Sequence, residues 1–422
     1  MQDFKVIIKN KNFLYLWSSQ ILSQLSINVM NFLLLIKLFS ETGSTIATSL
    51  LWVAWAVPAI VIGPFAAASV DIVERRKILI ISNILQALTI LFYVFVHQIR
   101  FFIIYGVVLI YSFLNQFYVP AESASLPSLV KEKDLPHANG LFLLTQQAAL
   151  IVGFGIAGIL NTVLGFKTSI FLCSFALFLA FISVLFLPRL EVEQIKSKNY
   201  EESFFKFFRR IVEGYTFIKD NKNILMPFIL LMILQICLAI ITVNFPAVAS
   251  EIFRININSA GLVLAVPAGI GAAISALTIP KLMKTKYRKK EIIEKSILLI
   301  IFAAILLIFL VPILEGFIRT IVGILVIMAF GFAFIGILIP AQTYLQEKTP
   351  GGLRGRVFGN FWFLTTIATL VPVVFSGTIV ELFGIKLLLF LFSMVFLGIL
   401  IFSKKLGQKY LENGFYLNNE NV

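Results

Sequence analysis

Long apolar runs recur through almost the whole of this chain, and no other feature constrains its fold as strongly. Of its 422 residues, 59% are hydrophobic and only 13% are charged, a balance that is not typical of a soluble protein of this length. A run of about 20 apolar residues can cross a bilayer as a helix, because a helix satisfies its own backbone hydrogen bonds. Twelve such spans are predicted: 13–37, 44–69, 78–97, 101–121, 140–161, 166–187, 224–250, 258–281, 292–312, 317–343, 356–380 and 385–403. The predicted fold class is an all-α membrane protein with twelve transmembrane helices.

The basic residues indicate how these spans are oriented. With the N-terminus inside the cell, 29 of the 35 Lys and Arg residues fall in cytoplasmic segments, and each outer segment holds one. Cytoplasmic loops are rich in Lys and Arg, and a missed or invented span would destroy this alternation. The pattern therefore predicts a multi-pass protein with both termini in the cytoplasm. It also accounts for the net charge of +14 without a nucleic-acid partner.

Short sequence matches indicate that the chain has two related halves. Ala56-Val57-Pro58-Ala59 in the second span recurs as Ala265-Val266-Pro267-Ala268 in the eighth, and Pro120-Ala121 in the fourth recurs as Pro340-Ala341 in the tenth. Matches at corresponding spans are typical of parallel repeats in transporters. The expected domains are an N-terminal six-helix half (1–187), a cytoplasmic linker (188–223), a C-terminal six-helix half (224–404) and a cytoplasmic tail (405–422).

The linker mixes Phe with basic residues over positions 203–214. In one interpretation this segment is an amphipathic helix that lays Phe into the inner leaflet while Lys and Arg meet anionic headgroups, which would make membrane lipids a partner. In the other interpretation it is a linker helix packed beneath the bundle. Neither interpretation makes it a substrate site.

Three places in the sequence carry a resemblance to a known family. They are the loop segment 63–77, the segment 119–130 together with 138–140, and the segment 346–350 together with 354–357. Together they resemble the major facilitator superfamily, and within it the drug:proton antiporter branch with macrolide efflux proteins and enterobactin-type siderophore exporters. The resemblance covers roughly residues 10–405. Three loop positions depart from the family pattern: Ala67, Ile72 and Glu74.

The resemblance implies a gate at the loop that follows the second span. In the family, the loop Asp is thought to cap helix 11 and to latch the outward-facing state. Carried over, this role falls to Asp71 with Arg75 and Arg76, facing the helix that is expected to begin near Gly355 and Arg356. A carboxylate is favourable at a helix N-terminus. The alternative is a loop whose charges only fix the orientation of the protein.

Polar side chains within the spans are candidates for a substrate cavity, because they are costly in lipid. Gln20, Gln24, Asn28 and Asn31 follow the spacing i, i+4, i+8, i+11 in the first span, within about 80° of one helix face. Such a stripe indicates a water-filled cavity or, alternatively, hydrogen bonds between packed helices. Further candidates in other spans are Tyr111, Asn115, Gln116, Gln147, Gln235 and Gln342.

Proton coupling requires a carboxyl group that is reachable from the cavity, and no Asp or Glu lies near the middle of a predicted span. The nearest is Glu122, at the cytoplasmic end of the fourth span, whose repeat counterpart is the neutral Gln342. Partial burial would favour its protonated form. The alternative is a loop carboxylate that pairs with Lys131 or Arg75.

Other motifs are given structural interpretations. Residues 153–158 spell G-x-G-x-x-G, but they lie inside an apolar run with no preceding strand, so we expect close helix packing rather than a dinucleotide site. His97 and His137 fall at opposite membrane faces, so no metal site is predicted. We find no nucleophile–base constellation or P-loop, and we expect neither an enzyme nor a cofactor.

The sequence therefore predicts a monomeric secondary transporter in a bacterial-type cytoplasmic (inner) membrane. It would export lipophilic or amphiphilic small molecules, of macrolide or multidrug type, by proton antiport and alternating access. Its expected partners are a small-molecule substrate, protons and membrane lipids. The alternatives are a siderophore or lysophospholipid transporter and, from another class, a transporter-derived membrane sensor or scaffold.

Overall fold

The computed structural model of the protein describes residues 7–70, 72–98, 102–190, 209, 212–285 and 287–405. Over these residues the chain is helical and contains no strand. Ten of the described helices are long and apolar enough to cross a membrane, and α3 (Thr45–Val61) is a shorter apolar helix. All twelve predicted spans fall on helices, because α7 (Leu135–Leu185) covers two of them. The predicted all-α membrane fold is confirmed.

Gly165 divides α7 into two helices. Its backbone has φ 78° and ψ 162°, which is not helical. Glycine adopts positive φ at little cost because it lacks a Cβ atom. The predicted spans 140–161 and 166–187 therefore lie on either side of a real break.

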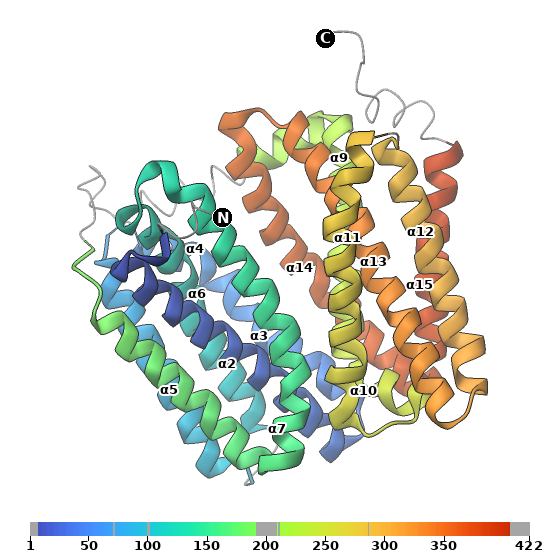
Figure 1. Cartoon of the computed structure of the whole chain (residues 1–422), viewed down its shortest axis with the longest axis horizontal. Coiled ribbons are helices and arrows are strands. Elements are labelled where there is room, and N and C mark those ends of the chain that lie inside the picture. Colours follow the sequence, from blue (N-terminus) through green and yellow to red (C-terminus); the bar gives the residue numbers. More distant parts are fainter. Residues whose placement is uncertain are drawn as a thin grey trace. The chain divides into compact units, whose positions relative to one another are not determined.

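The chain divides into two compact units (Figure 1). Unit 1 comprises residues 1–43 and 50–208, and unit 2 comprises residues 44–49 and 209–422. The first residues of α3 thus belong to unit 2. The remaining helices of unit 1 are α2 (Lys11–Thr42), α4 (Gly63–Ser69), α5 (Arg75–Val96), α6 (Ile103–Leu129) and α7, with a 3-10 turn at Glu132–Asp134.

Within unit 1, α2 packs along α7, while α5 packs against α6 and α7. The helices α2 and α7 approach each other closely at Gly153, where a Cβ atom would lie only 2.7 Å from the Cβ atom of Asn28 on α2. Small residues at helix crossings allow such contact. This is the close packing that was predicted for the G-x-G-x-x-G segment.

Asn10 fixes the start of α2. Its Oδ1 atom accepts hydrogen bonds from the backbone N–H groups of Asn12 (3.0 Å) and Phe13 (3.3 Å), which would otherwise lack partners in the first turn. Its Nδ2 atom donates to the carbonyl oxygen of Leu129, at 2.7 Å. The cap therefore also ties the start of α2 to the last residue of α6.

Unit 2 contains the other six spans. Its elements are α9 (Lys222–Val243), α10 (Phe245–Ala247), a π-helical turn (Val248–Phe253), two short turns (Ile257–Ser259 and Gly261–Ala265), α11 (Val266–Thr285), α12 (Lys289–Ile305) with its extension (Leu306–Leu310 and Val311–Ile313), α13 (Gly316–Lys348), α14 (Gly351–Phe383) and α15 (Ile385–Lys405). The helices α11 and α13 pack against each other along their lengths. A Cβ atom at Gly271 would clash with the Met328 carbonyl, and one at Gly331 with the Ala268 carbonyl.

The start of α14 lies close to the predicted one. The helix begins at Gly351, about one turn before the predicted start near Gly355 and Arg356. Pro350 precedes it in an extended conformation, and its carbonyl accepts a hydrogen bond from the Leu353 N–H at 2.9 Å. Two adjacent glycines indicate a loop in the sequence, but the preceding proline restricts the backbone and allows the helix to start there.

Candidate functional site

Buried polar side chains gather inside unit 1, on α2, α5 and α6. The buried set comprises Ser19, Gln20, Ser23, Ser26 and Asn28 on α2, Ser82, Asn83 and Gln86 on α5, and Tyr111, Ser112, Tyr118, Glu122 and Ser125 on α6. Polar groups within membrane helices are costly and commonly mark functional pathways. Unit 1 therefore contains the main candidate site.

A chain of hydrogen bonds connects three helices at this site. The Tyr118 hydroxyl donates to Glu122 Oε1 at 2.8 Å, one turn along α6. The same hydroxyl lies 3.2 Å from Ser19 Oγ on α2. Ser19 Oγ also accepts a hydrogen bond from Asn83 Nδ2 on α5, at 3.0 Å. Asn83, Ser19 and Tyr118 are fully buried, and Glu122 is 4% exposed.

Glu122 has no basic partner in the part of the chain that the structure describes. Among those residues, the buried side chains of charged type are Glu122 and Lys289. Lys289 forms an ion pair with Glu347, whereas the described ion pairs do not include Glu122. The carboxyl group is therefore held by Tyr118 rather than by a counter-ion.

Arg75 and Arg76 bind the ends of neighbouring helices. Arg75 Nη1 donates to the carbonyl oxygen of Ala124 at 2.8 Å and to Ser128 Oγ at 3.3 Å. Arg76 Nη2 donates to the carbonyl oxygen of Leu185 at 2.7 Å. Leu185 is the last residue of α7, and carbonyls in the last turn of a helix lack intrahelical partners, so Arg76 satisfies this one. Asp71, the predicted gating carboxylate, lies outside the described residues.

A basic residue also begins a helix in unit 2, but it lies near an aromatic ring instead of binding a carbonyl oxygen. Lys289 is the first residue of α12, as Arg75 is of α5. Aligning Pro120 with Pro340 places Tyr344 at the position of Ala124, and the Lys289 ammonium lies 6.0 Å from the Tyr344 ring centroid. In both units a basic first residue therefore lies near the same position of the next helix; the internal repeat itself stays a prediction.

Gly355 and Arg356 lie near the start of α14, where the end of the linker packs. Arg356 Nη1 lies 2.7 Å from Glu213 Oε2, and Glu213 Oε1 also accepts from Arg209 at 3.1 Å. A Cβ atom at Gly214 would clash with the Asn360 side chain. This end of segment 203–214 is therefore packed against α14, while residues 203–208, 210 and 211 lie outside the described residues.

Of the four residues in the polar stripe of the first span, two are buried and two are partly exposed. Gln20 is buried and donates from Nε2 to the Phe142 carbonyl on α7 at 3.3 Å. Asn28 is buried too, but donates to the carbonyl of Gln24 on its own helix at 2.7 Å. Gln24 and Asn31 are partly exposed. Two of the four residues are thus packed inside unit 1.

The other predicted cavity residues are more dispersed. Tyr111 is buried on α6. Gln116 faces α4, with its Oε1 atom 3.8 Å from the position of a Cβ atom at Gly63. Asn115, Gln116, Gln235 and Gln342 are partly exposed, and Gln147 is exposed. Their contribution to a substrate pathway stays a prediction.

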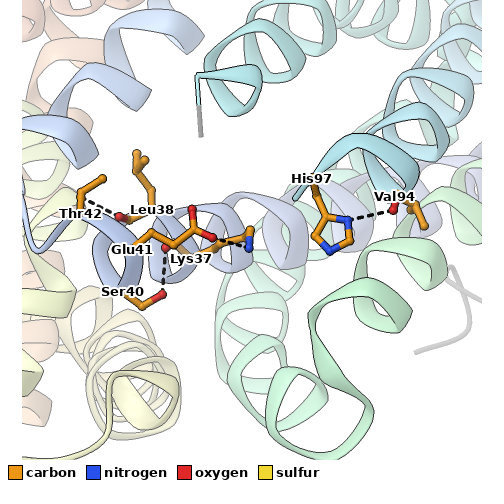
Figure 2. A network of polar contacts seen from close by, with 7 residues as sticks. All are labelled: Lys37, Leu38, Ser40, Glu41, Thr42, Val94 and His97. Carbon is orange, nitrogen blue, oxygen red and sulfur yellow. Dashed lines mark hydrogen bonds and ion pairs between the residues drawn. The ribbon is translucent and has the colours of Figure 1, made fainter. Parts of the chain in front are cut away.

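A second polar cluster lies at the opposite end of unit 1 (Figure 2). Lys37 Nζ lies 2.6 Å from Glu41 Oε1 and 4.7 Å from the Phe166 ring centroid. The His97 ring lies 5.5 Å from the same Phe166 ring, and its Nδ1 atom is 2.9 Å from the Val94 carbonyl oxygen. Within the described residues there is no group of three or more His, Cys, Asp or Glu that could hold a metal ion. These contacts join the ends of α2 and α5 to α7.

Ser19, Asn83 and Tyr118 were not among the predicted site residues. One sequence signal points to Tyr118 and another to Ser19, whereas none points to Asn83. Tyr118 and Glu122 have the spacing i, i+4, which places them on the same helix face. Ser19, Ser23 and Ser26 follow the spacing i, i+4, i+7, a second polar stripe on the first span beside the one formed by its Gln and Asn residues.

A membrane protein with paired helical halves, membrane-length helices throughout and a polar interior in one half has the architecture of a multi-pass transporter. Residues 16–372 match the Major Facilitator Superfamily. The chain belongs to this superfamily of membrane transporters.

Two relatives and one solved structure illustrate this membership. The chain is 27% identical over 429 residues to YfiS, an uncharacterized MFS-type transporter of Bacillus subtilis (strain 168), covering 98% of this chain and 97% of YfiS. It is 24% identical over 397 residues to macrolide efflux protein A of Streptococcus pyogenes, covering 89% and 90%. The crystal structure of the nucleoside transporter NupG shares the fold, with a TM-score of 0.70, 16% identity and coverage of 93% and 99%.

Proposed function

We propose that this transporter exports lipophilic or amphiphilic small molecules, of macrolide or drug-like type, in exchange for protons. It would work by alternating access in the cytoplasmic membrane, with both termini inside the cell. The observation that carries the proposal is the buried Glu122 carboxyl, which accepts a hydrogen bond from Tyr118 and lacks a basic partner among the described residues.

The chemistry of Glu122 suits a proton carrier. An ionised carboxylate is expensive to hold in a low-dielectric interior without a counter-ion. A neutral carboxyl group avoids that cost, and the Tyr118 hydroxyl offsets part of it for the ionised form. A group that is acceptable in both states can bind a proton on one side of the membrane and release it on the other.

The proposed substrate class rests on two further points. The relative named macrolide efflux protein A aligns along 89% of this chain. In addition, the charged residues of the described spans lie towards the ends of their helices or at Glu122. A substrate path without charges at its centre suits neutral or weakly cationic bulky compounds better than phosphorylated ones.

A vesicle assay tests the substrate class and the coupling together. Inverted membrane vesicles containing the protein are energised to an acidic interior, which is reported by quenching of a pH-sensitive dye. Macrolides, cationic dyes and a catecholate siderophore are added one at a time. We expect dequenching with macrolides or dyes. No dequenching with any compound would contradict proton-coupled export, and a response to the siderophore alone would contradict the substrate class.

The matched control for the coupling residue is Glu132, an exposed carboxylate in the loop after α6. Glu122→Gln should abolish dequenching, while Glu132→Gln should keep it. Both substitutions remove one carboxylate and keep the side-chain shape, so a difference between them reflects the position of Glu122.

A further inference from the structure

The hydrogen-bond chain that ends at Glu122 has a fixed direction when that carboxyl group is ionised. A carboxylate can only accept, so the single Tyr118 proton points at Glu122 Oε1. The Tyr118 oxygen must then accept from Ser19, whose only proton is thereby used. Ser19 Oγ must in turn accept from the Asn83 NH2 group, which is the orientation observed. Every donor in the chain points toward the carboxylate.

Protonation of Glu122 on Oε1 would reverse every one of these bonds. The new carboxyl O–H would donate to Tyr118, the Tyr118 hydroxyl would rotate and donate to Ser19, and the Ser19 hydroxyl would donate to Asn83. The two hydroxyls keep their own protons, so one proton is added in total and it stays on Glu122. An NH2 group cannot accept the last bond, so Asn83 must present its Oδ1 atom instead.

Asn83 has the features that such a reversal requires. The residue is fully buried, and its Oδ1 atom is a buried acceptor without a hydrogen-bond partner. Rotation of the amide by about 180° exchanges Nδ2 for Oδ1 at nearly the same place, because the two groups are almost identical in shape. The unpaired acceptor is therefore available for the Ser19 hydroxyl in the protonated state.

In the described part of the chain, no charged side chain on the neighbouring helices contacts the Glu122 carboxyl group. From α5, Arg75 is bound to Ala124 and Ser128, and Arg76 to Leu185. From α2 the contact is Ser19, and on α6 itself it is Tyr118. The helix α4 carries no titratable side chain, and none of the described ion pairs joins His137, near the start of α7, to Glu122. The carboxyl group is thus linked to the rest of unit 1 through the uncharged chain alone.

We infer that Ser19 and Asn83 are positioning residues for the proton site, and that the Asn83 amide reorients each time Glu122 gains or loses a proton. The inference rests on the proposed role of Glu122 and adds to it. Through this reorientation, the contacts of α5 and α2 would depend on the protonation state of Glu122 on α6.

Infrared difference spectroscopy tests this directly, with the full chain in phosphatidylcholine vesicles and spectra recorded at acidic and alkaline pH. Glu122→Gln assigns the carboxyl band, and Asn83→Leu with ¹⁵N-asparagine labelling assigns the amide band. We expect both bands in the wild-type difference spectrum. In Ser19→Ala the amide band should be lost while the carboxyl band remains, and Ser19→Thr, which keeps the hydroxyl, should restore it.

Two further variants complete the test. Ser125→Ala is the matched control, because Ser125 is equally buried beside Glu122 but bonds the Ala121 carbonyl on its own helix; it should keep both bands. Tyr118→Phe interrupts the hydrogen-bond chain at another residue, so its spectrum should also lack the amide band. This variant keeps the proposal testable if Ser19→Ala does not fold.

The outcomes separate this inference from the proposed function. A carboxyl band without an amide band, or an amide band that survives in both Ser19→Ala and Tyr118→Phe, overturns the reorientation of Asn83 alone. A spectrum without a Glu122 band overturns both proposals. Both bands in a protein that moves no protons with substrate would leave the reorientation supported and contradict the antiport.

Discussion

Tyr118 and Glu122 form a hydrogen bond of 2.8 Å, one helical turn apart, in the buried interior of unit 1. A hydrogen bond to a charged group contributes roughly 1.5–3 kcal/mol. The protonated carboxyl also bonds Tyr118, but more weakly, so only the difference of about 1 kcal/mol between the two bonds affects the proton equilibrium. Because about 1.4 kcal/mol corresponds to one pH unit, Tyr118→Phe should move the pH profile of transport by about half a unit to one unit. The check is substrate-driven proton release measured across a range of pH. Tyr215→Phe, on an exposed tyrosine of the linker, is the control, and an unmoved profile in Tyr118→Phe would count against the role of this bond.

The ion pair between Lys289 and Glu347 predicts an asymmetry between two substitutions. The Lys289 side chain is 9% exposed and that of Glu347 is 45% exposed. Glu347→Gln leaves a buried ammonium without its partner, whereas Lys289→Met leaves a carboxylate that water can reach. We expect Glu347→Gln to lower the free energy of unfolding by about 1–2 kcal/mol, allowing for the exposure of Glu347, and Lys289→Met to lower it by less. Chemical denaturation in detergent measures both, with Glu291→Gln as the exposed control; equal effects would refute the asymmetry.

Two glycines set the distance between α11 and α13. A Cβ atom at Gly271 or Gly331 would collide with a backbone carbonyl of the other helix, which cannot move aside as a flexible side chain can. Each Gly→Ala substitution should therefore lower the free energy of unfolding by about 1–3 kcal/mol. The measurement is thermal unfolding followed with a thiol-reactive fluorophore, because Cys173 is buried and Cys237 partly buried. Gly398→Ala, which would meet no atom within 4 Å, should unfold like the wild type; similar losses at all three sites would contradict the account.

The contact of the linker with α14 should depend on shape more than on charge. Glu213 and Arg356 are both more than a third exposed, so their ion pair contributes at most about 1 kcal/mol. Gly214, by contrast, lies against the Asn360 side chain and the Arg356 backbone. We expect Gly214→Val to raise amide hydrogen exchange over residues 212–220 by about tenfold or more, and Glu213→Gln to change it only slightly. The reverse order would show that charge holds the linker.

The sequence was sufficient to predict the spans, because the apolar runs and the alternation of basic residues report directly on the solvent that each segment meets. It placed the start of α14 to within about one turn, because the residues before it, Pro350, Gly351 and Gly352, are typical of a loop.

The candidate site was predicted only in part. Glu122 was found because it is the acidic residue that lies closest to the middle of a span. Asn83 was not, because a single Asn in an apolar run is common and its partner lies on another helix. Ser19 was missed because its stripe with Ser23 and Ser26 lies beside the longer side chains of the Gln and Asn stripe. A pattern within one span reports a helix face, but it does not report which face of the next helix meets it. Arg75 illustrates the same limit, since its contact with Ala124 joins residues on different spans.

The central claim is that Glu122 carries the exchanged proton, and the most direct test compares two activities of one variant. Proteoliposomes containing Glu122→Gln are assayed for efflux driven by a pH gradient and for exchange of labelled against unlabelled substrate without a gradient. We predict that the driven efflux is lost while the exchange persists, because a neutral amide leaves the substrate path intact and removes the proton site. Driven efflux equal to that of the wild type would contradict the claim.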